Sequence, residues 1–97
     1  AIEDYNQAAK LKPNNTALIA NMGMVYYEAN DFEKAITYFD RALEIQPDKP
    51  STLYNRGMAY YNLIEYPKAL VDFEKACALK SEDACYMLKD LRKALKK

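Results

Sequence analysis

The chain has 97 residues, of which 51% are hydrophobic, and it carries 14 basic and 14 acidic side chains. This length fits one small domain, and the balanced charge gives no bulk attraction to nucleic acid or to an anionic membrane. The sequence has no histidine and two glycines, which removes the commonest general base and any glycine-rich phosphate loop. No apolar run approaches the ~18 residues of a membrane span, and no signal peptide is recognisable. We therefore expect a cytoplasmic, non-catalytic protein with no cofactor and no metal site.

Residues 1–12 place apolar side chains at helical spacing and are followed by Pro13, which predicts a short first helix. They align with residues 35–46, so we interpret residues 1–15 as half of a repeat. Exposed apolar patches mark association sites. Because this helix has no partner helix in the sequence, we expect a weak homodimer through residues 1–12, with Ile2, Tyr5 and Ala9 in contact.

Residues 16–49 form a unit that recurs in residues 50–83. Helical spacing and turn residues predict helices over 16–29 and 31–46 in the first unit, and over 51–64 and 66–79 in the second. A fixed period of this size indicates a stacked repeat array. The coinciding positions are Asn21/Asn55, Gly23/Gly57, Met24/Met58, Tyr26/Tyr60, Tyr27/Tyr61, Lys34/Lys68, Ala35/Ala69, Phe39/Phe73 and Ala42/Ala76.

The last segment departs from the repeat, since Leu91 stands where the period calls for glycine. An apolar stripe of Ala84, Leu88, Leu91 and Leu95 with charged residues between predicts an amphipathic helix. We interpret residues 84–97 as a capping helix, which shields the last apolar face of an array. The two cysteines do not make a disulfide framework, and we expect both to be reduced and partly buried.

The residues that carry the period resemble the tetratricopeptide repeat, a helix–turn–helix unit of 34 residues. The first unit matches its signature at Ile19, Met22, Gly23, Tyr26, Ala35, Phe39, Ala42 and Pro47. The second matches at Leu53, Arg56, Gly57, Tyr60, Ala69, Phe73 and Ala76, with Ser81 in place of the usual proline. The resemblance implies a single all-α domain, a right-handed α-solenoid of antiparallel helix pairs with about six helices.

In such arrays the first helix of each unit lines a concave groove. A recurring asparagine, methionine and tyrosine set suits a peptide, because amides bond its backbone while the other two contact apolar side chains. We therefore predict a protein-interaction module that binds a peptide segment, with a cationic end favouring an acidic residue. The predicted peptide-binding residues are Asn21, Met24, Tyr27, Tyr54, Asn55, Met58, Tyr61, Lys89 and Arg92.

Two alternatives stay open: a self-association module, and an accessory repeat segment of a larger enzyme or assembly. Some tetratricopeptide domains clamp an acidic chaperone tail with a set of lysine, asparagine, asparagine, lysine and arginine. Asn55 and Lys89 fit that set, whereas its other positions fall on Ala20, Met24 and Cys85. We therefore do not expect specificity for chaperone tails.

Overall fold

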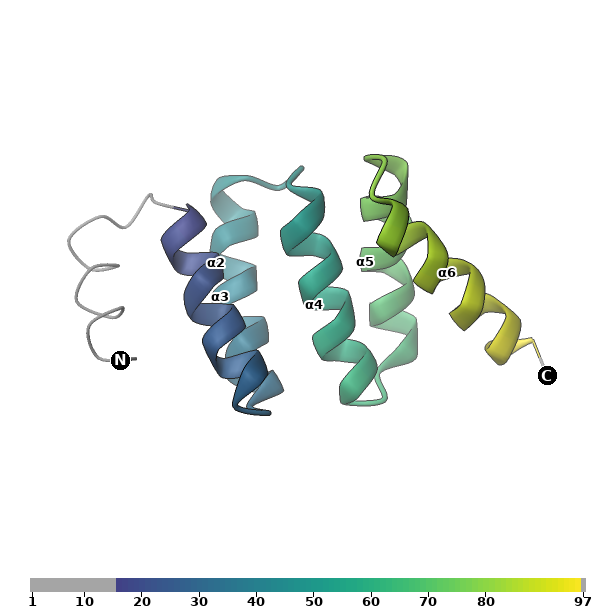
Figure 1. The fold of residues 1–97 in the computed structure, drawn as a ribbon, viewed down its shortest axis with the longest axis horizontal. Coiled ribbons are helices and arrows are strands. Elements are labelled where there is room, and N and C mark those ends of the chain that lie inside the picture. Colours follow the sequence, from purple (N-terminus) through teal and green to yellow (C-terminus); the bar gives the residue numbers. More distant parts are fainter. Residues whose placement is uncertain (1–15, 97) are drawn as a thin grey trace.

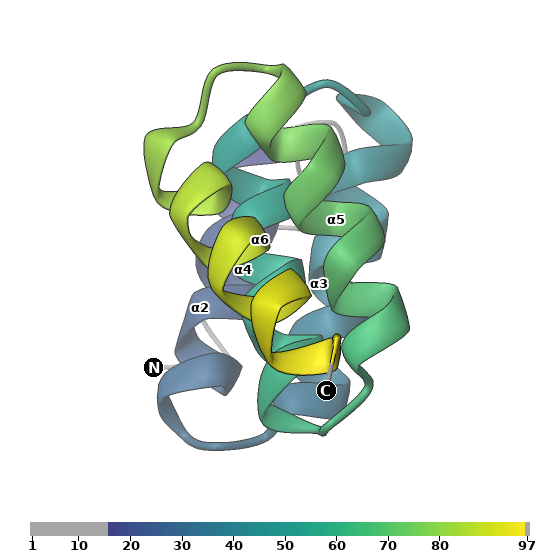
Figure 2. The same ribbon diagram turned by 90° about the vertical axis from the view of Figure 1, so that its right-hand side faces the viewer.

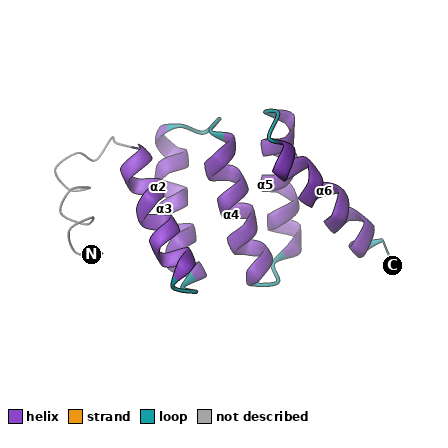
Figure 3. Cartoon of the chain, viewed as in Figure 1, coloured by secondary structure: helices purple, strands orange, loops and turns teal. Residues whose placement is uncertain are grey.

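The computed structural model describes residues 16–96, which form five helices and no strands (Figures 1 and 3). They are α2 (Thr16–Glu28), α3 (Phe32–Ile45), α4 (Pro50–Asn62), α5 (Tyr66–Ala78) and α6 (Glu82–Leu95). The expectation of about six helices is thus one too many for the part described. The helix and half repeat predicted before residue 16, and the dimer contact assigned to them, lie outside the described residues.

Local chemistry sets where the helices begin. The Asp31 side chain accepts a hydrogen bond from the backbone N–H of Lys34, and the Ser81 side chain accepts one from Ala84, both at 3.3 Å. These bonds satisfy helix N–H groups that otherwise have no partner. Pro50 and Pro67 stand in the first turns of α4 and α5, where a missing N–H costs nothing.

The turns within the helix pairs share an unusual backbone conformation. Asn30, Ile64 and Lys80 have φ values of 63°, 60° and 74°, in the left-handed region. At each turn the next residue donates its N–H back into the preceding helix, as Glu65 does to the Tyr60 carbonyl at 2.9 Å. Asparagine tolerates this conformation, but a β-branched residue such as Ile64 is strained there.

The helices pack as antiparallel pairs in two layers. Viewed from the α6 end, α2, α4 and α6 lie on one side and α3 and α5 on the other (Figure 2). In the pairs α2–α3 and α4–α5, a glycine on the first helix packs against a phenylalanine ring on the second. A Cβ on Gly57 would lie 2.7 Å from the Phe73 ring, and one on Gly23 would lie 2.5 Å from the Phe39 ring. Both rings are fully buried, so the glycines allow the close helix approach that the period predicted.

An ionic bridge joins three helices around Arg56. Its guanidinium donates to both carboxylate oxygens of Asp72 on α5, at 2.8 and 2.7 Å, and to Asp40 on α3 at 2.7 Å. Asp72 is only 2% exposed. Hydrogen bonding to Asp72, together with Asp40, raises the pKa of Arg56 above its usual range. The arginine at this signature position therefore ties the second repeat to the first.

The expectation that the two cysteines are reduced is wrong in this structure. Cys77, in the last turn of α5, forms a disulfide with Cys85, in the first turn of α6. The connection between the two helices turns back sharply and brings the Cα atoms of Cys77 and Cys85 to 4.6 Å from each other. This separation lies within the usual range for a disulfide. The bond thus fastens the last helix to its neighbour.

Among the described residues no helix is both long and apolar enough to span a bilayer.

Candidate functional site

The nine predicted peptide-binding residues all lie on the layer made by α2, α4 and α6. Asn21, Met24 and Tyr27 belong to α2, and Lys89 and Arg92 belong to α6. The other four, on α4, are Tyr54, Asn55, Met58 and Tyr61. The helices that carry them lie side by side in one layer of the array (Figures 1 and 2), although the exposure and contacts of the nine side chains differ greatly.

The two asparagines are available to a ligand. Asn21 is exposed and Asn55 is half-buried. Among residues 16–96, neither side-chain amide forms a hydrogen bond. An amide that the fold does not use has both donors and its acceptor free. These are the predicted residues whose chemistry best suits the backbone of an extended peptide.

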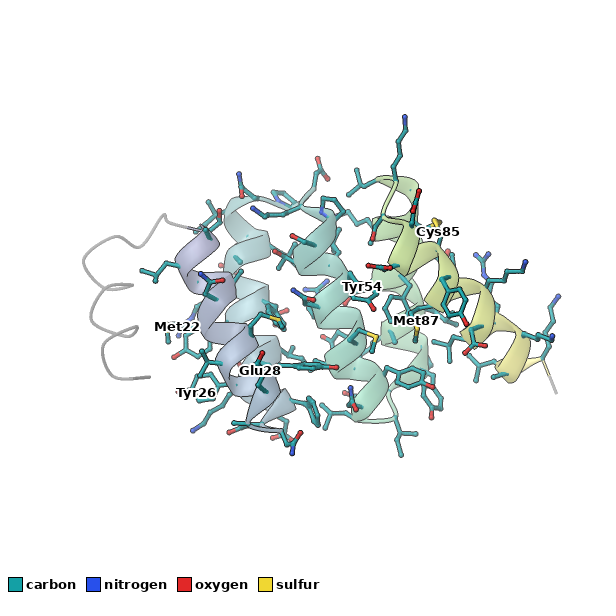
Figure 4. All side chains as sticks on the ribbon, viewed as in Figure 1. Met22, Tyr26, Glu28, Tyr54, Cys85 and Met87 are labelled. Atoms are coloured by element: carbon teal, nitrogen blue, oxygen red, sulfur yellow. A yellow bond between two sulfur atoms is a disulfide. The ribbon has the colours of Figure 1, made fainter. Side chains whose placement is uncertain are left out.

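The predicted aromatic and methionine residues of α4 are each partly exposed and partly packed against the core. Tyr54, Met58 and Tyr61 are half-buried and pack against the central apolar cluster. The Tyr54 ring lies 5.9 Å from that of Phe73, and burial raises the pKa of Tyr54. Tyr54 projects from α4 toward α6 (Figure 4). Only part of each side chain is therefore free to contact a ligand.

Tyr27 is held by contacts between helices. Its hydroxyl accepts a hydrogen bond from the Asn62 amide at 3.0 Å, and its ring meets Phe32 edge-on at 5.2 Å. The Asn62 amide also donates to the Met58 carbonyl at 2.8 Å. Tyr27 thus links α2 to α4 with a fixed ring. Met24, on the same helix, is half-buried.

Lys89 and Arg92 both line a hollow of about 490 Å³, which we call the α5–α6 hollow. Arg92 also forms an ion pair with Glu74 on α5 at 3.6 Å. Within the described part of the chain, Lys89 has no acidic partner, and neither cation is hydrogen-bonded to the two asparagines. The full lining is Cys77, Cys85, Leu88, Lys89, Arg92, Lys93 and Lys96.

Two family models match the chain. One, described as TPR repeat, covers residues 23–63, and the other, described as tetratricopeptide repeat, covers residues 51–82. The chain belongs to the tetratricopeptide repeat family. Solved tetratricopeptide structures superpose on nearly its whole length and agree with the two-layer arrangement of helix pairs.

One such structure is the first TPR of Spaghetti (RPAP3) bound to the HSP90 peptide SRMEEVD. It has 22% identity and a TM-score of 0.92, and the match covers 99% of this chain and 78% of that one. Another is YrrB, a TPR protein with an unusual peptide-binding site, with 26% identity and a TM-score of 0.89 over 99% of this chain and 50% of that one. At such identities the likeness establishes the fold.

A curated relative is anaphase-promoting complex subunit 3 of Schizosaccharomyces pombe. It is 39% identical over 36 residues, which is 37% of this chain and 5% of that subunit. The match therefore spans a small part of both proteins, about one tetratricopeptide repeat in length.

Sequence reasoning missed part of the cationic site. Lys93 and Lys96 join Lys89 in the α5–α6 hollow, and Cys77 contributes to it from α5. The spacing 85, 88, 89, 92, 93 and 96 marks one side of a helix, so the lysines could have been grouped from the sequence alone. The contribution of Cys77 from α5 could not have been predicted from the sequence, because it depends on how the capping helix α6 packs against α5.

Residues 16–96 contain no group of three or more Cys, Asp or Glu side chains arranged to hold a metal ion. The carboxylates Asp40 and Asp72 are both bonded to Arg56.

Proposed function

We propose that this tetratricopeptide domain is a protein-interaction module that binds an extended peptide along the face formed by α2, α4 and α6. The observation that carries the proposal is the pair Asn21 and Asn55. They occupy the same position in successive repeats, 34 residues apart in the sequence. Both amides lack a hydrogen-bond partner in the described chain.

In this proposal each part of the face has a separate role. The amides of Asn21 and Asn55 bond the peptide backbone. The exposed parts of Met24, Tyr27, Met58 and Tyr61, with Tyr54 beside α6, contact its apolar side chains. Lys89 and Arg92 favour an acidic residue or a carboxylate at the α6 end. Two similar solved structures, the first TPR of Spaghetti (RPAP3) with its bound peptide and YrrB with its peptide-binding site, support this use of the fold.

The test begins by selecting peptides from a displayed library for binding to the intact chain. Calorimetric titration then measures the affinity of the selected peptides. Asn21→Ala/Asn55→Ala should weaken binding by about fivefold or more, since a net hydrogen bond contributes ~0.5–1.5 kcal/mol. The melting temperature should stay unchanged, because the fold does not use these amides. Asn30→Gly is the matched control, as it removes an exposed amide from a turn whose φ of 63° suits glycine.

Salt dependence tests the cationic end. Exposed ion pairs weaken as salt screens them, so Lys89→Ala should leave the affinity less sensitive to ionic strength. An unchanged affinity in the double alanine variant, with the peptide mapped to α3 and α5, would rule out this face as the binding site.

An alternative function is that of a repeat segment within a larger assembly, and the match to an anaphase-promoting complex subunit favours it. In that case the α2–α4–α6 face would contact a neighbouring subunit. Cross-linking of this chain at Asn55 to a folded protein subunit, with no peptide selected by display, would favour this alternative.

A further inference from the structure

The α5–α6 hollow carries an excess of positive charge. Arg92 is the one lining cation with an acidic partner among the described residues, Glu74 at 3.6 Å. Lys89, Lys93 and Lys96 are exposed and have none. The whole chain has a net charge of zero, so this is a local cluster. It suits a carboxylate more than any neutral ligand.

The helix that carries these cations is joined covalently to α5 near its first turn. Cys85 joins it to Cys77 across eight residues of sequence, and Lys89 follows Cys85 by about one helical turn. Beyond the disulfide, Ala84, Leu88 and Leu91 supply the buried residues of α6. Cys85 stands near the start of α6, beside the top of α5 (Figure 4). The disulfide therefore acts together with these buried residues and the Arg92–Glu74 ion pair to hold the cation-bearing helix against α5.

The sulfur atoms are also within reach of solvent. Cys77 and Cys85 are half-buried and both line the open hollow. A dithiol reagent can therefore attack the bond, because thiol–disulfide exchange depends on access to one sulfur.

We propose that the α5–α6 hollow binds an acidic segment of the peptide partner, and that the Cys77–Cys85 disulfide controls this binding by fixing α6 on α5. This rests on the proposed peptide-binding function. Reduction by a dithiol breaks the sulfur–sulfur bond, gives two thiols on the chain and leaves the reductant as a disulfide. A low-molecular-weight disulfide reverses the exchange and is itself reduced to two thiols.

Two measurements on the whole chain test this. After oxidation by glutathione disulfide, maleimide labelling and mass spectrometry should find no free thiol, and dithiothreitol should restore two. Hydrogen exchange in residues 84–95 should be faster in the reduced protein. If α6 is then docked for a third of the time, the affinity for fluorescein-labelled Leu-Glu-Glu-Leu-Asp should fall about threefold.

The variant Cys77→Ser/Cys85→Ser supplies the control. It should match the reduced protein in exchange and affinity, and it should not respond to reductant. Two free thiols after oxidation, or equal α6 exchange in both redox states, would overturn the redox control. Equal peptide affinity in both states would overturn it as well. If neither state binds this acidic peptide while a display-selected peptide still binds, the assignment of the hollow to an acidic segment fails and the proposed function stands. If no display-selected peptide binds either, the proposed function fails, and the exchange of α6 decides whether the disulfide controls its docking.

Discussion

The turn at Ile64 offers a sharp test of backbone strain, because the chain contains its own comparison. Ile64 and Asn30 occupy the same position in successive repeats, with φ values of 60° and 63°. A left-handed conformation costs a residue with a Cβ roughly 1–2 kcal/mol, and asparagine adopts it more readily than most. Ile64→Asn should therefore stabilise the protein, and Asn30→Ile should destabilise it.

The size of each effect follows from exposure. Ile64 is 71% exposed, so its replacement loses under a third of the ~1.5–3 kcal/mol that full burial contributes. Relief of strain less this loss leaves a gain of about 0.5–1 kcal/mol for Ile64→Asn. Asn30→Ile should cost about 1 kcal/mol or more. At ~4–8 °C per kcal/mol, melting temperatures should rise by about 2–8 °C and fall by at least about 4 °C.

Urea unfolding followed by circular dichroism measures both changes through the transition midpoint. Val71→Asn is the control for removing an exposed apolar side chain, since Val71 is 63% exposed and lies within α5. It should not stabilise the protein. If Ile64→Asn lowers the midpoint, or Asn30→Ile leaves it unchanged, the positive φ at these turns stores no appreciable strain.

Three further predictions concern the core and the ionic bridge. Gly57→Leu should lower stability by several kcal/mol in thermal unfolding, because overpacking costs ~1–3 kcal/mol or more. Even a Cβ at this position would lie 2.7 Å from the buried Phe73 ring. An unchanged melting temperature would contradict that contact. Asp72→Ala should destabilise by about 2–4 kcal/mol in urea, since it leaves Arg56 half paired, whereas a loss below 1 kcal/mol would show that water replaces the carboxylate. Burial raises the pKa of Tyr60, which favours its neutral form in the folded state, so this stability is present below pH ~10 and is lost as pH rises through the folded pKa. Tyr60→Phe should reduce the alkaline loss seen in urea titrations from pH 8 to 11, and an identical pH profile would argue against it.

The repeat period predicted most of the architecture. It located α2 to α5 to within one or two residues, because the apolar positions and turn residues recur together, whereas α6 was predicted from its apolar stripe. It also predicted the close approach at Gly23 and Gly57, since a glycine inside a helix pattern is explained by packing. The strained turn could have been found as well, by aligning Ile64 with Asn30.

Other features depend on contacts that a single repeat does not show. The disulfide was not predicted, because the period aligns Cys77 with Leu43 and Cys85 with Ser51, and no cysteine recurs. The ionic bridge left a signal that was not used: where the first repeat has Met22 and Tyr38, the second has Arg56 and Asp72. Opposite charges that replace uncharged residues together suggest a pair.

The candidate site was predicted as a set of positions and not as a set of contacts. Asn21 and Asn55 form no side-chain hydrogen bond among the described residues, and their contact with a peptide stays a prediction. The rings of Tyr54 and Tyr61, by contrast, pack against the rings of Phe73 and Tyr66, respectively. Such packing depends on side-chain directions that the period does not fix.

The ionic bridge bears on how the domain loses its structure. In a repeat array the stability is approximately a sum of terms within repeats and terms between neighbours, and the second kind decides whether repeats melt one by one. Arg56 belongs to the second repeat, yet it bonds Asp40 of the first as well as Asp72 of its own. Opening either repeat leaves one of these charges without its partner. The bridge therefore adds to the coupling between the two repeats, which favours their unfolding together.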